Sequence, residues 1–137
     1  MPRPSKTEQV RRKYLKTSCR ARGREERTNP DDIAEFLSLT HDPDARVRRE
    51  AVQCLCPCHV QTNHPGVWDR LLEMVTDPDL KVRATVLHTL GDGSPRAREA
   101  EVVAAIEKIY HEPDLKLRRH VRQLLASYRR QGNINVL

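Results

Sequence analysis

The octapeptide HDPDARVR at residues 41–48 decides the fold, because it returns twice at a spacing of 35 residues. It recurs as TDPDLKVR at residues 76–83 and as HEPDLKLR at residues 111–118. A fixed period of this length indicates a solenoid, in which stacked units each contact only their neighbours. The repeat therefore predicts a binding scaffold, although it does not name the ligand.

Each unit is predicted to contain two helices. The first helices are expected over residues 30–40, 65–75 and 95–110, each opening with a proline, which suits the first helical position. The second helices are expected to follow the acidic turns, with the turn proline as their first residue. Their apolar stripes have i, i+4, i+8 spacing and comprise Val47/Ala51/Leu55, Val82/Val86/Leu90 and Leu117/Val121/Leu125. Gly91 and Gly132 are expected to end the second and third of these helices.

The pattern Asp-Pro-Asp-x-x-Val-Arg-x-x-Ala-x-x-x-Leu at residues 42–55 resembles the HEAT repeat, and the resemblance extends over residues 29–128. Four columns are identical in all three units, namely Pro43/78/113, Asp44/79/114, Arg48/83/118 and Leu55/90/125. The resemblance implies an all-α fold, a right-handed α-solenoid of about three helical hairpins whose second helices line the concave face. It also implies an interaction scaffold. We expect one repeat domain over 29–137, with units 29–62, 63–93 and 94–137.

The basic charge is concentrated at the N-terminal end. Residues 1–28 hold ten Lys/Arg and three Asp/Glu, whereas residues 29–137 hold fifteen and sixteen. A capping box at Ser5 and Glu8 and a stop at Gly23 predict a helix that caps the solenoid. This basic segment is interpreted either as a solvated cap or as a nucleic-acid surface. The phosphate contacts in the second interpretation are Arg12, Lys16, Arg20, Arg22, Arg24 and Arg27.

The invariant arginine of each unit is assigned to structure rather than to ligand binding. We expect it to pair with an aspartate of its own or an adjacent turn, at position 42, 44, 77, 79 or 114, because bidentate Arg–carboxylate pairs would fix the stacking register. The predicted ladder comprises Asp44, Arg48, Asp79, Arg83, Asp114 and Arg118.

A neighbouring basic column is the candidate binding stripe. Repeated once per unit, it places charges roughly 10 Å apart along the second helices. It would follow an acidic partner helix or, in the nucleic-acid alternative, continue the N-terminal phosphate contacts; a merely solvated face is the third interpretation. The predicted partner-binding residues are Arg46, Arg49, Lys81, Lys116, Arg119 and Arg122.

The run Cys54-Leu55-Cys56-Pro57-Cys58-His59 is the most unusual local feature. Thiolate and imidazole suit zinc or iron, and Cys56, Cys58 and His59 are the candidate ligands. The spacing departs from the Cys-x-x-Cys knuckle, so we expect ordinary reduced thiols and no cofactor.

No Ser/His/Asp order, paired-acid cleft or phosphate-binding glycine loop is present, so we expect no catalytic residues and no enzyme. The absence of a long apolar run or an apolar leader predicts a cytoplasmic protein without membrane association. The favoured function is a non-enzymatic adaptor, monomeric or homodimeric, that binds a protein partner along its concave face. Nucleic-acid or ribonucleoprotein binding is the alternative.

Overall fold

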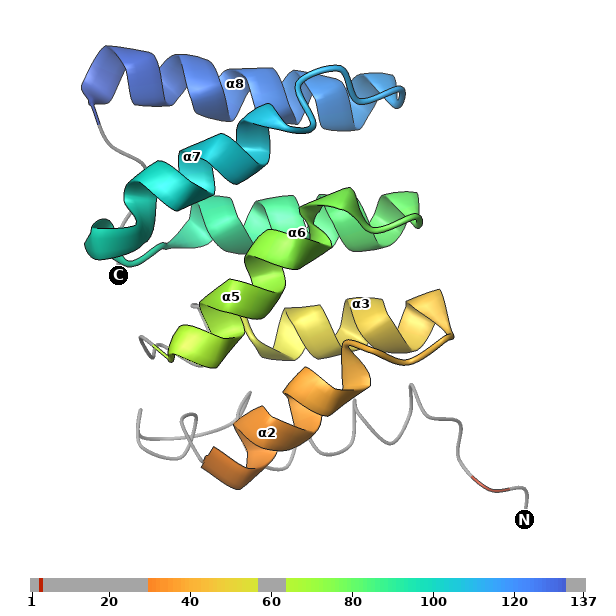
Figure 1. Cartoon of the computed structure of the whole chain (residues 1–137). Coiled ribbons are helices and arrows are strands. Elements are labelled where there is room, and N and C mark those ends of the chain that lie inside the picture. The colour runs from red at the N-terminus through yellow and green to blue at the C-terminus, as the bar shows by residue number, and fades with distance from the viewer. Residues whose placement is uncertain (1–2, 4–29, 57–63, 133–137) are drawn as a thin grey trace.

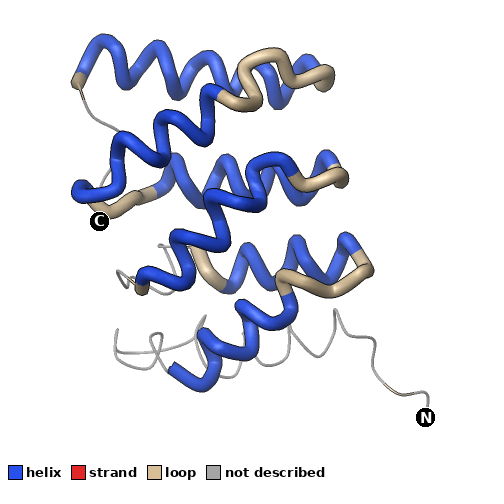
Figure 2. Tube along the Cα trace, in the orientation of Figure 1, coloured by secondary structure: helices blue, strands red, loops and turns tan. Residues whose placement is uncertain are grey.

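The computed structural model describes residue 3 and residues 30–56 and 64–132. Its α-helices are α2 (Pro30–Leu39), α3 (Ala45–Cys54), α5 (Pro65–Glu73), α6 (Leu80–Asp92), α7 (Glu99–Glu107) and α8 (Leu115–Gln131). Two short 3₁₀ helices, η2 (Met74–Thr76) and η3 (Arg96–Arg98), follow α5 and precede α7. Figure 2 shows helices joined by loops, with no strand in the described ranges. The predicted capping helix lies outside these ranges.

The helices form two layers. Helices α2, α5 and α7 lie side by side in one layer, and α3, α6 and α8 form the other, with the hairpins stacked in chain order (Figure 1). The contacts of α3 with α6 and of α6 with α8 connect successive units. This arrangement confirms the predicted all-α solenoid. None of the described helices is long and apolar enough to cross a membrane.

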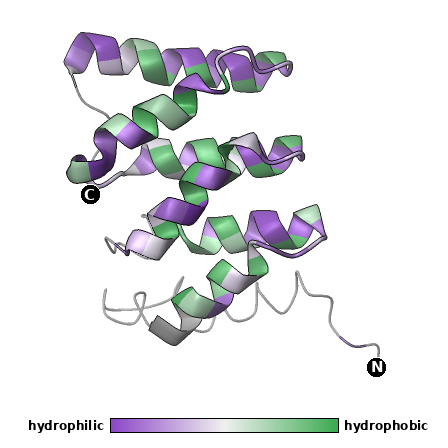
Figure 3. Cartoon of the chain, viewed as in Figure 1, coloured by the Kyte–Doolittle hydropathy of each residue, from purple (hydrophilic) through white to green (hydrophobic). Residues whose placement is uncertain are grey.

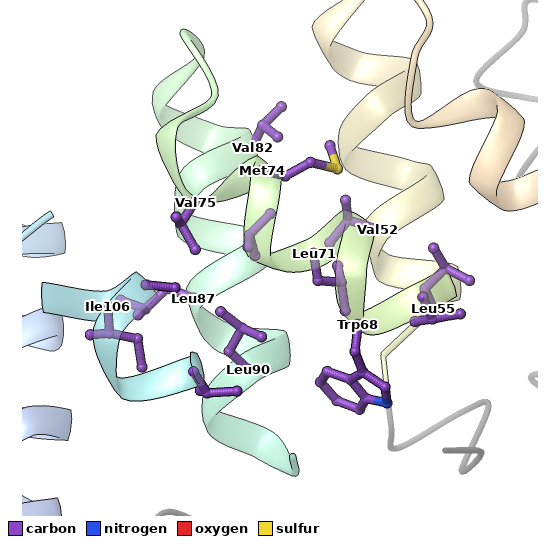
Figure 4. Packing of buried hydrophobic residues seen from close by; sticks show 14 of the residues in the cluster. Val52, Leu55, Trp68, Leu71, Met74, Val75, Val82, Leu87, Leu90 and Ile106 are labelled. Carbon is purple, nitrogen blue, oxygen red and sulfur yellow. The ribbon is translucent and has the colours of Figure 1, made fainter. Parts of the chain in front are cut away.

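One continuous apolar core runs between the two layers. The predicted second-helix stripes are buried in every unit, at 4% exposure or less. The first helices add Phe36, Trp68 and Ile106, each no more than 2% exposed. Figure 4 shows side chains of α3, α5, α6 and α7 meeting in this core. The i, i+4, i+8 spacing therefore identified the buried face correctly.

The second helices begin two residues later than the sequence suggested. Their N-caps are Asp44, Asp79 and Asp114, whose carboxylates accept helical N–H groups. The turn prolines precede these caps, so their predicted place at the first helical position is wrong. The reason is the acidic residue before each proline: the Asp77 carboxylate, for example, accepts the Asp79 N–H at 2.9 Å and closes the turn.

We expect Asp79→Ala to lower the free energy of unfolding by about 1 kcal/mol, because the Val82 N–H would lose its capping partner. Urea denaturation followed by circular dichroism measures this loss. Asp79→Asn is the control, since asparagine also caps well and should keep most of the stability. Equal destabilisation by both variants would contradict the assignment of Asp79 as a cap.

The two glycines behave differently. Gly132 ends α8 in the left-handed conformation, with φ 74° and its N–H donating to the Tyr128 carbonyl at 2.7 Å, as predicted. The prediction for Gly91 is wrong, because α6 continues to Asp92. A Cβ atom on Gly91 would lie 3.2 Å from the Leu124 side chain. Gly91 therefore lets α8 approach α6 closely instead of ending the helix.

Candidate protein-binding surface

A ladder of arginine–carboxylate pairs connects the units at the turns. Arg48 donates from Nε and Nη2 to the two carboxylate oxygens of Asp77, both at 3.0 Å. Its Nη1 donates to the carbonyls of Asp42 and Pro43 in its own turn. The hydrogen bond to Asp77 is the main cause of a raised Arg48 pKa. One guanidinium thus holds its own turn and the next unit together.

The second rung repeats this geometry with glutamate. Arg83 donates to the Glu112 carboxylate from Nε at 3.0 Å and from Nη2 at 2.8 Å, and Nη1 donates to the Asp77 carbonyl. The prediction had offered several acids, and its final set of Asp44, Asp79 and Asp114 is wrong for this role. Those three side chains cap their own helices. The acid before the turn proline, Asp77 or Glu112, binds the arginine of the preceding unit instead.

A groove lies between α6 and α8 on the second-helix layer. It has a volume of about 630 Å³. Its apolar part comprises Leu80, Ala84 and Leu117, and Leu80 is 39% exposed although it is a large apolar residue. Basic side chains from both helices line the same groove, and its remaining members are Asp114, His120 and Gln123. An apolar floor with polar edges is the usual composition of a ligand-binding groove.

Three of the predicted binding residues meet at this groove. Lys81, Lys116 and Arg119 line it, all three are exposed, and none makes a side-chain hydrogen bond or ion pair with any other part of the chain that the structure describes. Arg49 occupies the column of Arg119 two units away, with Ala84 between them, and is likewise unpaired, with its Nε buried without a hydrogen-bond partner. The three cations of the groove, Lys81, Lys116 and Arg119, are therefore available to an incoming anionic group.

The other two predicted binding residues are engaged elsewhere. Arg46 pairs with the Asp44 carboxylate at 3.1 Å, and this exposed contact lowers the Asp44 pKa. Arg122 lies over the Tyr110 ring, 4.4 Å from its centroid, and its Nε donates to the Tyr110 carbonyl. The predicted stripe is therefore discontinuous. Its unpaired cations lie mainly on α6 and α8, whereas Arg122 contacts Tyr110 within the third hairpin.

His120 adds a neutral polar group to the groove. Burial lowers the His120 pKa, and electrostatic repulsion between the two imidazoles of His120 and His88 lowers it further. Since the ordinary histidine pKa is already about 6.5, His120 is uncharged at neutral pH. The positive charge of the groove at pH 7 consequently comes from lysine and arginine alone.

The cysteine run is only partly described. Cys54 and Cys56 are buried, and the Cys56 Sγ lies 3.6 Å from an Asp92 carboxylate oxygen. No group of three or more metal-ligating side chains occurs in residues 30–56 and 64–132. The other two candidate zinc ligands, Cys58 and His59, lie outside those residues, as do the six arginines and lysines assigned to phosphate contacts. Zinc and nucleic-acid binding at these positions stay predictions.

The repeated hairpins, the conserved turn geometry and the rung pairing together point to one family. Residues 33–126 match the family model for HEAT repeats. The chain belongs to the HEAT-repeat family. HEAT repeats generally serve as protein-interaction modules. Searches of curated proteins and of solved structures give no match to this HEAT-repeat protein.

Sequence reasoning missed the apolar half of the groove. Leu80 and Leu115 follow directly after the N-caps and lie outside the buried stripes, at 39% and 51% exposure. Their place off the i, i+4, i+8 pattern was the available signal, because an apolar residue outside the core stripe faces solvent or a partner. In this HEAT-repeat protein, only Leu80 of the two lines the groove.

Proposed function

We propose that this HEAT-repeat protein is a non-catalytic adaptor that binds a protein partner in the groove between α6 and α8. The observation that carries the proposal is a groove in which the exposed Leu80 and the half-buried Ala84 lie beside three unpaired cations, Lys81, Lys116 and Arg119. An amphipathic helix with acidic flanks would bury its apolar face on Leu80 and Ala84 while its carboxylates reach the cations. This is the helix-in-groove mode of recognition.

The experiment reverses the charge of the groove. We expect the double variant Lys81→Glu/Lys116→Glu to lose the partner protein that the wild-type chain captures from nuclease-treated cell extract, because like charges would then face the acidic flanks. Quantitative mass spectrometry of the captured proteins measures the loss, which we expect to exceed about tenfold, equivalent to about 1.4 kcal/mol.

The matched control changes the same charge in the other layer. Lys108 is exposed at the end of α7 and makes no side-chain ion pair or hydrogen bond in the described part of the chain. Lys108→Glu should capture the partner as wild type does. Equal capture by wild type and the groove variant would refute binding in this groove.

Nucleic-acid binding through the basic residues 1–28 is the alternative, and the charge of that segment supports it. It predicts oligonucleotide affinity that falls with salt by roughly one log unit per log of salt for each phosphate neutralised. Residues 1–28 would supply the main phosphate contacts and Lys81 and Lys116 their continuation, so the groove variant should lose oligonucleotide affinity only in part. Fluorescence polarisation at several salt concentrations separates the two functions.

A further inference from the structure

The ladder of arginines has an open last rung. Arg118 repeats the first part of the pattern, since its Nη1 donates to the Glu112 carbonyl in its own turn at 3.3 Å. Its Nε and Nη2, which in the two preceding units grip a carboxylate, have no partner among the residues that the structure describes. Figure 1 shows α8 as the outermost described helix at this end of the stack.

The lower rungs show what this edge of the guanidinium binds. Arg48 and Arg83 each hold a side-chain carboxylate of the next unit with two hydrogen bonds of 2.8–3.0 Å. The planar guanidinium of arginine matches a carboxylate in this geometry. Because the Arg118 Nη1 is already hydrogen-bonded, the Arg118 side chain loses less conformational entropy when it binds a ligand. Arg118 is therefore prepared for the same ligand group.

The surface around Arg118 is mainly basic, and its exposed apolar residue is Leu115, one turn before Arg118 on α8. Helix α8 contains six Lys/Arg and no Asp/Glu, and it is coloured largely hydrophilic in Figure 3. Arg122, one turn after Arg118 on the same face, stands where the preceding units have the buried Val52 and Leu87. A further apolar repeat would find no core contact at this position.

We propose that Arg118, together with Arg122, is a docking site for a carboxylate-bearing segment of an acidic partner protein. This inference rests on the proposed function. It specifies that the partner would also present carboxylates to a second surface, on α8 outside the groove. Charge complementarity selects the occupant: a face that combines two cations with a single exposed apolar residue, Leu115, favours an acidic segment. Two copies of this chain meeting through this face of α8 would instead place Arg118 and Arg122 of one copy against the same cations of the other.

The test uses the full chain and a fluorescein-labelled oligoglutamate peptide as the carboxylate probe. We expect Arg118→Lys to weaken binding of this peptide about tenfold, because lysine keeps the charge but cannot form the bidentate contact. Arg96→Lys is the matched control: Arg96 is exposed in η3 and unpaired in the described part of the chain, so it should leave binding unchanged. Circular dichroism verifies that each variant is folded.

Three results would overturn the proposal. The first is failure of the wild-type chain to bind oligoglutamate. The second is equal binding by wild type and Arg118→Lys, which would show general charge attraction instead of a carboxylate site. The third is tighter binding of a single-stranded oligonucleotide of equal charge that Arg118→Lys weakens to the same extent, which would make this a phosphate surface. Loss of oligoglutamate binding in Lys81→Glu/Lys116→Glu but not in Arg118→Lys would leave the proposed groove standing and reject the docking site at Arg118.

Discussion

Replacing Arg83 with alanine is expected to lower the free energy of unfolding by about 3 kcal/mol. The Glu112 side chain is only 3% exposed and receives both hydrogen bonds of this rung from Arg83. Without the guanidinium, a buried carboxylate would face the preceding unit with no counter-charge. The Asp77 and Pro78 carbonyls would also lose their donor.

Arg118→Ala is the matched control, since it removes the same residue from the one rung that holds no carboxylate in the described structure. We expect it to cost about 1 kcal/mol or less. Urea denaturation curves of the two variants give the comparison. If Arg118→Ala proved as destabilising as Arg83→Ala, the carboxylate of the next unit would not be the source of the ladder's stability.

Leu87→Ala is expected to destabilise the protein by about 3 kcal/mol, from lost apolar burial plus the cavity left behind. Leu87 is fully buried in the core. The stack is short, so little neighbouring structure can move in to fill the space. Thermal and urea unfolding both measure this loss.

Arg122→Ala tests the same repeat column at the end of the stack. Arg122 is exposed and contacts Tyr110 through its guanidinium, so its removal should cost about 1 kcal/mol or less. A loss comparable to that of Leu87→Ala would mean that Arg122 has a structural role that its exposure does not indicate.

The architecture could be predicted because it depends on local periodicity. The 35-residue spacing sets the stacking, and the i, i+4, i+8 stripes, such as Val82, Val86 and Leu90, determine the buried face. Each hairpin also ends or begins with residues whose conformational preferences act locally. Gly132 is the clearest case, because only its own backbone decides the end of α8.

The predictions that proved wrong concern contacts between units, which the sequence of a single unit does not determine. Each turn offers two acidic residues, and the sequence alone cannot show that Asp44 and Asp79 turn inward to their own helices while Asp77 turns toward Arg48. The prediction that Gly91 ends its helix was wrong for a similar reason. Leu124 is distant from Gly91 in the sequence and lies close to it only when the units stack. The groove likewise exists only once α6 and α8 lie together.

Summing charge over the repeats also concealed a local feature. Residues 29–137 are nearly neutral in total, but α8 carries six cations and no acid. The acids that balance them lie on the turns and on the first helices, such as Glu99, Glu101 and Glu107 of α7. Charge counted by helix would have identified α8 as a candidate anion-binding element.

The ladder also has a direction, which limits how such a chain can grow. Every unit offers an arginine forward and an acid backward, so an extra copy of the middle unit inserted between α6 and α7 would find a partner on both sides. A copy added after α8 would meet Arg122 where its predecessors present valine or leucine. Duplication of a unit within the stack would therefore preserve every rung, whereas a unit added after α8 would bring its core against Arg122.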